Sequence, residues 1–339
     1  MVSVFGAVGL IVVGTAIVWV AGGRLESASE RLGAHYGLPA VVQGAVIAAI
    51  GSSFPELTSV VFSVLLYDNF DLGVGAIVGS AVFNILVIPG WSALRGRGLR
   101  ADRDVVYKET QFYMLAVAVL LLTFSLGVIY EPQPVANGLT STLTRPLALI
   151  PLALYAVYLF IQSQDVSDYD APEVNDVNAR RQWLLLVGSI LGILVGVEAL
   201  VEAAVSLEAT LGVPSAVWGL TVVAAGTSLP DTVVSVRAAE AGRGPTSLAN
   251  VLGSNTFDLL VAVPVGVLLV PGGRIALDFG TAVPMMGFLT VATLGFLVVT
   301  RTDLELDRPE AVALLMLYVV FIVWMILETL GVTALVPGV

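Results

Sequence analysis

Gly37-Leu-Pro-Ala-Val-Val-Gln-Gly44-Ala-Val-Ile-Ala-Ala-Ile-Gly51-Ser-Ser-Phe-Pro-Glu56 is the stretch from which the architecture of this chain can be inferred. A second copy lies 175 residues further on, Gly212-Val-Pro-Ser-Ala-Val-Trp-Gly219-Leu-Thr-Val-Val-Ala-Ala-Gly226-Thr-Ser-Leu-Pro-Asp231. Each copy is an apolar run that ends in glycine, two hydroxyl residues, a proline and a carboxylate. Because proline lacks the N–H that a helix interior needs, the pattern predicts two helices broken at Gly51–Glu56 and Gly226–Asp231.

The composition is that of a polytopic helical membrane protein. The chain has 339 residues, of which 57% are hydrophobic and 12% charged, and its mean hydropathy is +0.95. Soluble domains carry about 25% charged residues. The formal net charge of -11 argues against a nucleic-acid partner. The absence of cysteine excludes disulfides and thiolate metal sites.

Ten apolar runs are long enough to cross a bilayer, which takes about 20 residues. The first lacks a basic flank before it, and we interpret it as a helix that stays in the protein. The predicted spans are roughly 2–21, 38–66, 72–92, 112–130, 146–162, 184–204, 213–236, 246–270, 277–300 and 310–330.

The basic residues orient these spans. With both termini outside, 13 of the 15 Lys and Arg residues fall in cytoplasmic loops, and only Arg145 and Arg274 fall outside. This asymmetry follows the positive-inside rule. It predicts a multi-pass protein of the cell membrane whose central loop is cytoplasmic.

The acidic loop at 163–182 divides the chain into two five-helix repeats, 1–162 and 183–339. We interpret it as a connector; a regulatory cation site there is the alternative. Because five is odd, the second repeat enters the membrane from the opposite side. The sequence therefore predicts an all-α fold of ten helices in two inverted repeats, as in secondary transporters.

Each repeat carries a second matching motif, Gly79-Ser-Ala-Val-Phe-Asn84 and Gly253-Ser-Asn-Thr-Phe-Asp258. The serine and the amide or acid are four apart and share one helix face. The glycine at the head of each motif is expected to let a neighbouring backbone come close. Ionisable groups at membrane depth are usually functional. Those predicted here are Glu56, Asp231 and Asp258, accompanied by Asn84 and by the hydroxyls of Ser52, Ser53, Ser80, Thr227, Ser228 and Ser254.

These groups offer only oxygen, which suits hard cations such as Ca²⁺. The cluster has no His or Cys, which disfavours Zn²⁺ and Cu²⁺. Pro55 and Pro230 are expected to leave carbonyls near Ala49 and Ala224 unpaired and able to hold an ion. Two carboxylates can neutralise one Ca²⁺, and the same oxygens can hold several Na⁺, so the two ions would exclude each other.

The four motifs resemble the two alpha repeats of the sodium/calcium exchanger family, within the cation/Ca²⁺ antiporter superfamily. The resemblance is most specific over residues 37–90 and 212–265. It implies exchange of Na⁺ for Ca²⁺ by alternating access without ATP, in the lipid bilayer. No obligatory protein partner is evident from the sequence. The family's binding positions fall on Ala49, Ser52, Ser53, Glu56, Ser80, Asn84, Ala224, Thr227, Ser228, Asp231, Ser254 and Asp258.

Asp231 stands where many members of the family have Glu, and this feature resembles the potassium-dependent branch. In that branch an acid at the position of Asp258 is linked to K⁺. Na⁺ and Ca²⁺ are thus the expected transported ions, and K⁺ coupling and an H⁺/Ca²⁺ antiporter stay open. The rivals from other classes are an intramembrane aspartyl protease, whose Gly-x-Gly-Asp motif is missing, and a passive cation channel.

Overall fold

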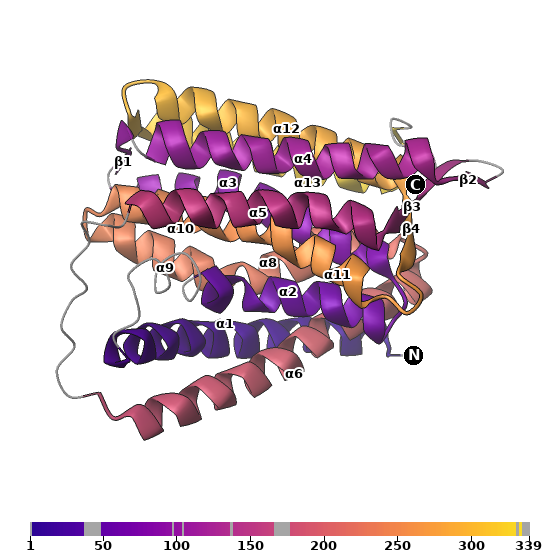
Figure 1. The fold of residues 1–339 in the computed structure, drawn as a ribbon, viewed down its shortest axis with the longest axis horizontal. Coiled ribbons are helices and arrows are strands. Elements are labelled where there is room, and N and C mark those ends of the chain that lie inside the picture. The colour runs from indigo at the N-terminus through magenta and orange to yellow at the C-terminus, as the bar shows by residue number, and fades with distance from the viewer. Residues whose placement is uncertain are drawn as a thin grey trace.

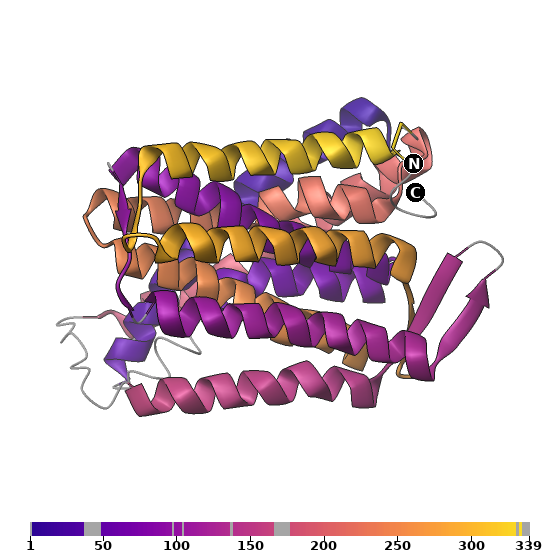
Figure 2. The ribbon, with the colours of Figure 1, turned by 90° about the horizontal axis from the view of Figure 1, so that it is seen from above.

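The computed structural model describes residues 2–36, 49–96, 98–103, 105–135, 138–165, 177–329 and 332–333. Residues 37–48, the first part of the motif that ends at Glu56, lie outside the described residues, as do 166–176 of the acidic loop. The described chain is a bundle of long helices that run roughly along one direction (Figures 1 and 2).

The elements follow one another in two similar series. The first half consists of α1 (Val4–His35), α2 (Ala49–Leu65), α3 (Phe70–Gly96), β1 (Leu99–Arg100), the π-helical turn η2 (Val105–Glu109), α4 (Thr110–Tyr130), β2 (Pro132–Val135), β3 (Gly138–Thr144) and α5 (Arg145–Asp165). The second half consists of α6 (Ala179–Leu211), α7 (Ser215–Trp218), the π-helical turn η4 (Gly219–Val223), α8 (Ala224–Thr227), α9 (Leu229–Glu240), α10 (Gly244–Phe257), the π-helical turn η5 (Asp258–Ala262), α11 (Val263–Leu269), β4 (Arg274–Asp278), α12 (Phe279–Arg301), β5 (Glu305–Leu306) and α13 (Arg308–Thr329).

Eight helices in the described part are long and apolar enough to cross a membrane, or nine if the bent pair 215–227 and 229–240 is one span. These correspond to nine of the ten predicted spans. The remaining one, predicted at 38–66, is described only over the 17 residues of α2. The chain is therefore a multi-pass membrane protein with at least eight candidate spans.

The break predicted at Gly51–Glu56 is wrong for the described residues. α2 continues from Ala49 to Leu65 with Pro55 inside it. A proline removes a single backbone hydrogen bond, here the one to the Gly51 carbonyl. A membrane helix that packs on its neighbours survives such a loss.

The break predicted in the second copy is confirmed. The helix through α7, η4 and α8 stops at Ser228, and α9 starts at Leu229 with a bend of 47°. Ser228 has φ -80° and ψ -1°. This ψ departs from the value of about -42° in a regular α-helix. Pro230 falls in the first turn of α9, where its missing N–H costs nothing.

α3 is the central helix of the bundle, and most of its residues are buried. Two of its glycines lie against the backbone of the second half. A Cβ added at Gly75 would overlap the Ala216 carbonyl oxygen, and one at Gly79 would overlap that of Leu220. The close approach predicted for Gly79 is thus confirmed. The one predicted for Gly253 is wrong, because a Cβ there would meet no atom within 4 Å.

Two small sheets correct the all-α prediction. β1 pairs antiparallel with β5, and β2, β3 and β4 form a three-stranded antiparallel sheet. The strands have two to seven residues, too few to show a period in the sequence. Figure 1 shows the sheets at opposite ends of the bundle, and each one joins a loop of the first half to a loop of the second.

α1 and α6 form an antiparallel pair along one side of the bundle (Figure 1). Their backbones approach closely at two glycines. A Cβ at Gly14 would lie 2.7 Å from the Gly196 carbonyl oxygen, and one at Gly196 would lie 2.9 Å from the Gly14 carbonyl oxygen. Small residues allow such approach between membrane helices.

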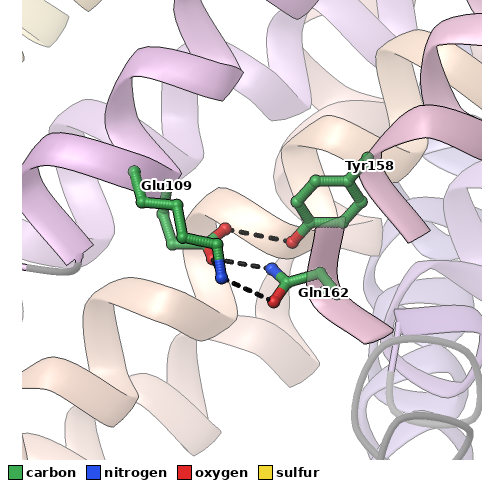
Figure 3. Close-up of polar contacts among 4 residues, drawn as sticks. Glu109, Tyr158 and Gln162 are labelled. Atoms are coloured by element: carbon green, nitrogen blue, oxygen red, sulfur yellow. Dashed lines mark hydrogen bonds and ion pairs between the residues drawn. The ribbon is translucent and has the colours of Figure 1, made fainter. Parts of the chain in front are cut away.

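A polar network ties the start of α4 to the end of α5 (Figure 3). The Tyr158 hydroxyl donates to Glu109 Oε2 at 3.0 Å, and Gln162 Nε2 donates to Glu109 Oε1 at 2.7 Å. Lys108 Nζ in turn donates to Gln162 Oε1 at 3.0 Å. The network fixes the end of α5 where the acidic loop begins.

Candidate cation site

The three acids singled out in the sequence come from three helices and are all buried. Glu56 lies in α2, Asp231 in the first turn of α9, and Asp258 where α10 passes into η5. Their exposed fractions are 1%, 2% and 0%. None of them faces lipid or water.

The structure brings these acids together. Glu56 lies within electrostatic range of Asp231, and Asp258 lies within range of both. Three negative charges near one another in a medium of low dielectric repel strongly. Such an arrangement is stable only when cations or protons balance the charge.

Neutral oxygens from both halves face the carboxylates. The hydroxyls of Thr227 and Ser228 face Glu56 across the two halves, and Ser53 faces Asp258 in the same way. Yet none of the six carboxylate oxygens of Glu56, Asp231 and Asp258 has a hydrogen-bond partner of normal geometry in the described structure. The same holds for Oδ1 of Asn84.

These seven oxygens are the main chemical signal of the site. A buried acceptor without a partner costs about 1–3 kcal/mol, and more if it is charged. All seven are acceptors of the kind that Ca²⁺ and Na⁺ prefer, and all belong to predicted site residues. Among the described residues, no three Asp, Glu, His or Cys side chains are grouped tightly enough to hold a metal ion.

Serine contacts connect the halves around the acids in a nearly symmetric way. Ser80 and Ser228 share a hydrogen bond of 2.8 Å between their Oγ atoms, and Ser52 and Ser254 share one of 2.9 Å. Ser53 Oγ also donates to the Ser254 carbonyl oxygen at 3.4 Å. In both pairs the serine of a second motif contacts a serine of the opposite first motif.

Asn255 is a structural residue of the site that the sequence analysis missed. Its Oδ1 accepts from Asn84 Nδ2 at 2.9 Å, and its Nδ2 donates to the Ala81 carbonyl oxygen at 3.1 Å. It lies in α10 and is fully buried against α3. The signal was its place next to Ser254, at the position where the first half has Ala81.

The carbonyl of Ala224 is not unpaired, which corrects the expectation for the second copy. It accepts from the Ser228 N–H at 3.1 Å and from Thr227 Oγ1 at 3.2 Å. The helical hydrogen bond to Ala224 comes from Ser228 and is intact. The hydrogen bond that Pro230 cannot donate is the one to the carbonyl of Gly226, four residues earlier. Ala49 is the first residue of α2.

Comparison with known proteins agrees with this geometry. The family profile described as sodium/calcium exchanger protein matches residues 6–164 and 181–327. The chain belongs to this family. The family consists of exchangers, so the chain is a membrane antiporter for cations and not an enzyme.

Individual relatives support the assignment. The chain is 27% identical to the sodium/calcium exchanger MaX1 of Methanosarcina acetivorans over 317 residues, which cover 85% of this chain and 89% of the relative. It is 34% identical to human sodium/potassium/calcium exchanger 4 over 129 residues, 35% of this chain and 20% of that protein. The fold matches a structure of the sodium-calcium exchanger NCX_Mj with a TM-score of 0.62 and 24% identity, over 95% of this chain and 99% of that one.

Proposed function

We propose that this protein exchanges Na⁺ for Ca²⁺ across the cell membrane by alternating access, with a shared ion site between two inverted repeats. The observation that carries the proposal is the set of seven buried, unpartnered oxygens of Glu56, Asp231, Asp258 and Asn84. A cation is the partner that such oxygens lack. The hydroxyls of Ser52, Ser53, Ser80, Thr227, Ser228 and Ser254 and the carbonyl of Ala49 would complete the coordination.

The charge of the site explains exchange. Glu56 and Asp231 together balance one Ca²⁺, and the same oxygens can instead be shared among several Na⁺. Because both ions need the same carboxylates, they exclude each other from the site. Movement of the site between the two sides of the membrane then couples the two gradients.

The pairing of the loops supports inverted repeats at 1–162 and 183–339. β1 follows the third helix of the first half and pairs with β5, which follows the fourth helix of the second half. At the other end β4 follows the third span of the second half and pairs with β3, which follows the fourth span of the first half. A two-fold axis in the membrane plane that relates the two halves would place the β1–β5 pair on the β4–β3 pair.

The basic residues support a cytoplasmic linker and external termini. Arg100 lies in β1, and Arg301 lies over the ring of Tyr107 at the same end of the bundle. Arg145 and Arg274 lie at the opposite end, with the three-stranded sheet. We assign the end that holds β1 and β5 to the cytoplasm, following the positive-inside rule.

Potassium coupling is the second candidate. Asp258 is an acid where the first half has Asn84, and one relative carries potassium in its name. An additional negative charge would allow a monovalent cation to accompany Ca²⁺.

The test is Ca²⁺ uptake into proteoliposomes of the purified protein, driven by an outward Na⁺ gradient. We expect uptake that stops when the Na⁺ gradient is removed. Uptake that follows a pH gradient instead would indicate an H⁺/Ca²⁺ antiporter, and a requirement for K⁺ would indicate the potassium-dependent type. Currents far above carrier turnover would indicate a channel.

A further inference from the structure

Glu26 is a carboxylate of α1 that lies between the two acid-bearing motifs. A Cβ added at Gly22, one turn earlier, would lie 2.6 Å from Cγ of Pro230, the residue before Asp231. A Cβ added at Gly51 would lie 3.6 Å from Cα of Glu26. α1 therefore crosses both motifs at this turn, beside α2 and α9 (Figure 1).

The surroundings of Glu26 are negative. Glu26 is partly buried, and its carboxylate lies within electrostatic range of Asp231 and Glu30. No ion pair with Glu26 occurs in the described structure. Asp231 is buried, and neither of its oxygens has a hydrogen-bond partner among the described residues. The two carboxylates thus share a region that attracts a cation.

The region has a direction. Glu30 is exposed and lies one turn beyond Glu26, towards the end of α1 at His35. The acids Glu30, Glu26 and Asp231 therefore form a series from the surface to the buried site. At the 175-residue offset that relates the motifs, the position of Glu26 is taken by Val201, which is buried. The acids of α6, Glu198 and Glu202, lie within electrostatic range of Tyr67 instead, and the acids within range of Glu56 among the described residues are Asp231 and Asp258.

We propose that Glu26 is a staging position for hydrated Ca²⁺ on its way to and from Asp231. The ion would use it only at the face of the protein where α1 ends at His35, which we call the α1 end. The inference rests on the proposed exchange function and adds the access route to it. A divalent ion that pauses there relieves the repulsion between Glu26 and Asp231 before it loses its water. Divalent cations gain more from this pair of charges than Na⁺ does.

The test compares the two faces of the protein in proteoliposomes. The chain has no cysteine, so a single Ser163→Cys substitution at the exposed end of α5 reports orientation through an impermeant thiol reagent. We expect Glu26→Gln to raise the KM for Ca²⁺ about tenfold at the α1 end, with Vmax and the KM at the other face unchanged. Glu26→Asp should restore most of the affinity. Glu202→Gln, on α6 nearer the opposite end, should leave the KM at the α1 end unchanged.

A charge-reporting variant covers the case in which Glu26→Gln does not fold. Glu26→Cys, without the Ser163→Cys substitution, can be modified after folding by a sulfonate or an ammonium reagent, and Ser163→Cys vesicles prepared in parallel give the orientation. We expect the sulfonate to lower the KM at the α1 end towards wild type and the ammonium to raise it. Equal KM values after both reagents, or KM changes of equal size at both faces, would overturn the inference.

The failure of the inference is distinct from the failure of the proposed function. If wild-type vesicles show no Na⁺-driven Ca²⁺ flux, both fall together. If the flux is present and does not respond to the charge at position 26, only the staging position falls.

Discussion

The two acid-bearing helices differ in shape although their sequences match at seven glycine, alanine, serine and proline positions. α2 passes through Pro55 without a break, whereas the helix that carries Asp231 bends by 47° at Ser228. The second motifs differ as well, because Gly79 is sealed against a backbone and Gly253 is open. The matching sequences therefore determine which residues come together at the site. The path of the backbone in each half depends on the helices packed around it.

This difference is informative for a carrier with inverted repeats. Alternating access requires that the two halves take up unlike conformations and exchange them. A molecule with two identical halves would open equally to both sides. We interpret the unbroken α2 and the bent α8–α9 pair as the two conformations of one element, seen together in a single state.

The largest expected effect follows from removing either central charge. Glu56→Gln and Asp231→Asn should each lower Ca²⁺ uptake about 100-fold or more, because a buried Ca²⁺ that loses one of its two carboxylate partners is left with uncompensated charge, at a cost of about 3–5 kcal/mol. Both variants should remain folded, since each removes a costly buried carboxylate. Na⁺-driven uptake of labelled Ca²⁺ measures the effect, with size-exclusion profiles as the control. Normal uptake in either variant would contradict the assignment of that acid to the Ca²⁺ site. It would also mean that the two halves do not contribute equivalent ligands.

The glycines of the second motifs give the next effect. Gly79→Ala should destabilise the protein by about 1–3 kcal/mol or prevent its folding, because the new methyl overlaps the Leu220 carbonyl oxygen. Gly253→Ala is the matched control and should be neutral or slightly stabilising, because space is open there and alanine favours helix. Thermal unfolding in detergent compares the two. Equal destabilisation would mean that the halves pack alike and that the asymmetry is smaller than it looks.

The polar ends of these motifs give a change of ion dependence instead of a loss. Asp258→Asn makes the second half resemble the first at the position of Asn84. We expect Ca²⁺ uptake to persist within about tenfold, while the Na⁺ or K⁺ dependence changes, because one negative charge is gone from the site. Uptake measured against each monovalent ion, together with the transported charge, checks this. An unchanged ion dependence would assign Asp258 a structural role.

Much of this arrangement could be predicted from the sequence, and the exceptions have physical causes. The length of the apolar runs predicted the membrane spans, and the motifs that place Glu56 and Asp231 next to prolines predicted a buried pair of acids. Both features depend on local sequence and can therefore be recognised without the structure. The path of the backbone through Pro55 could not be predicted, since it depends on whether neighbours compensate one lost hydrogen bond. Asn255 and the strand pairings between the halves, β1 with β5 and β3 with β4, escaped because their partners are distant in the sequence, as Asn84 is from Asn255 and Thr144 is from Arg274.

The smallest effect tests whether the contacts between the halves are equivalent. The pair Ser80 and Ser228 and the pair Ser52 and Ser254 have almost the same distance, 2.8 and 2.9 Å, and both are buried. A buried neutral hydrogen bond contributes about 0.5–1.5 kcal/mol, so alanine double-mutant cycles should give coupling energies in this range for both pairs. Chemical unfolding in mixed micelles measures them, with Thr302→Ala at an exposed helix end as the control.

Equal coupling energies would show that the serine contacts are shared by the two conformations and stay in place while the backbone around them differs. A pair with no coupling would instead mark the contact that opens when the site changes sides. The bend at Ser228 favours the first pair as the weaker one, because Ser228 lies where two helix segments meet at 47°. A stronger coupling at Ser80 and Ser228 than at Ser52 and Ser254 would therefore contradict the expectation that the bend weakens the contact at Ser228.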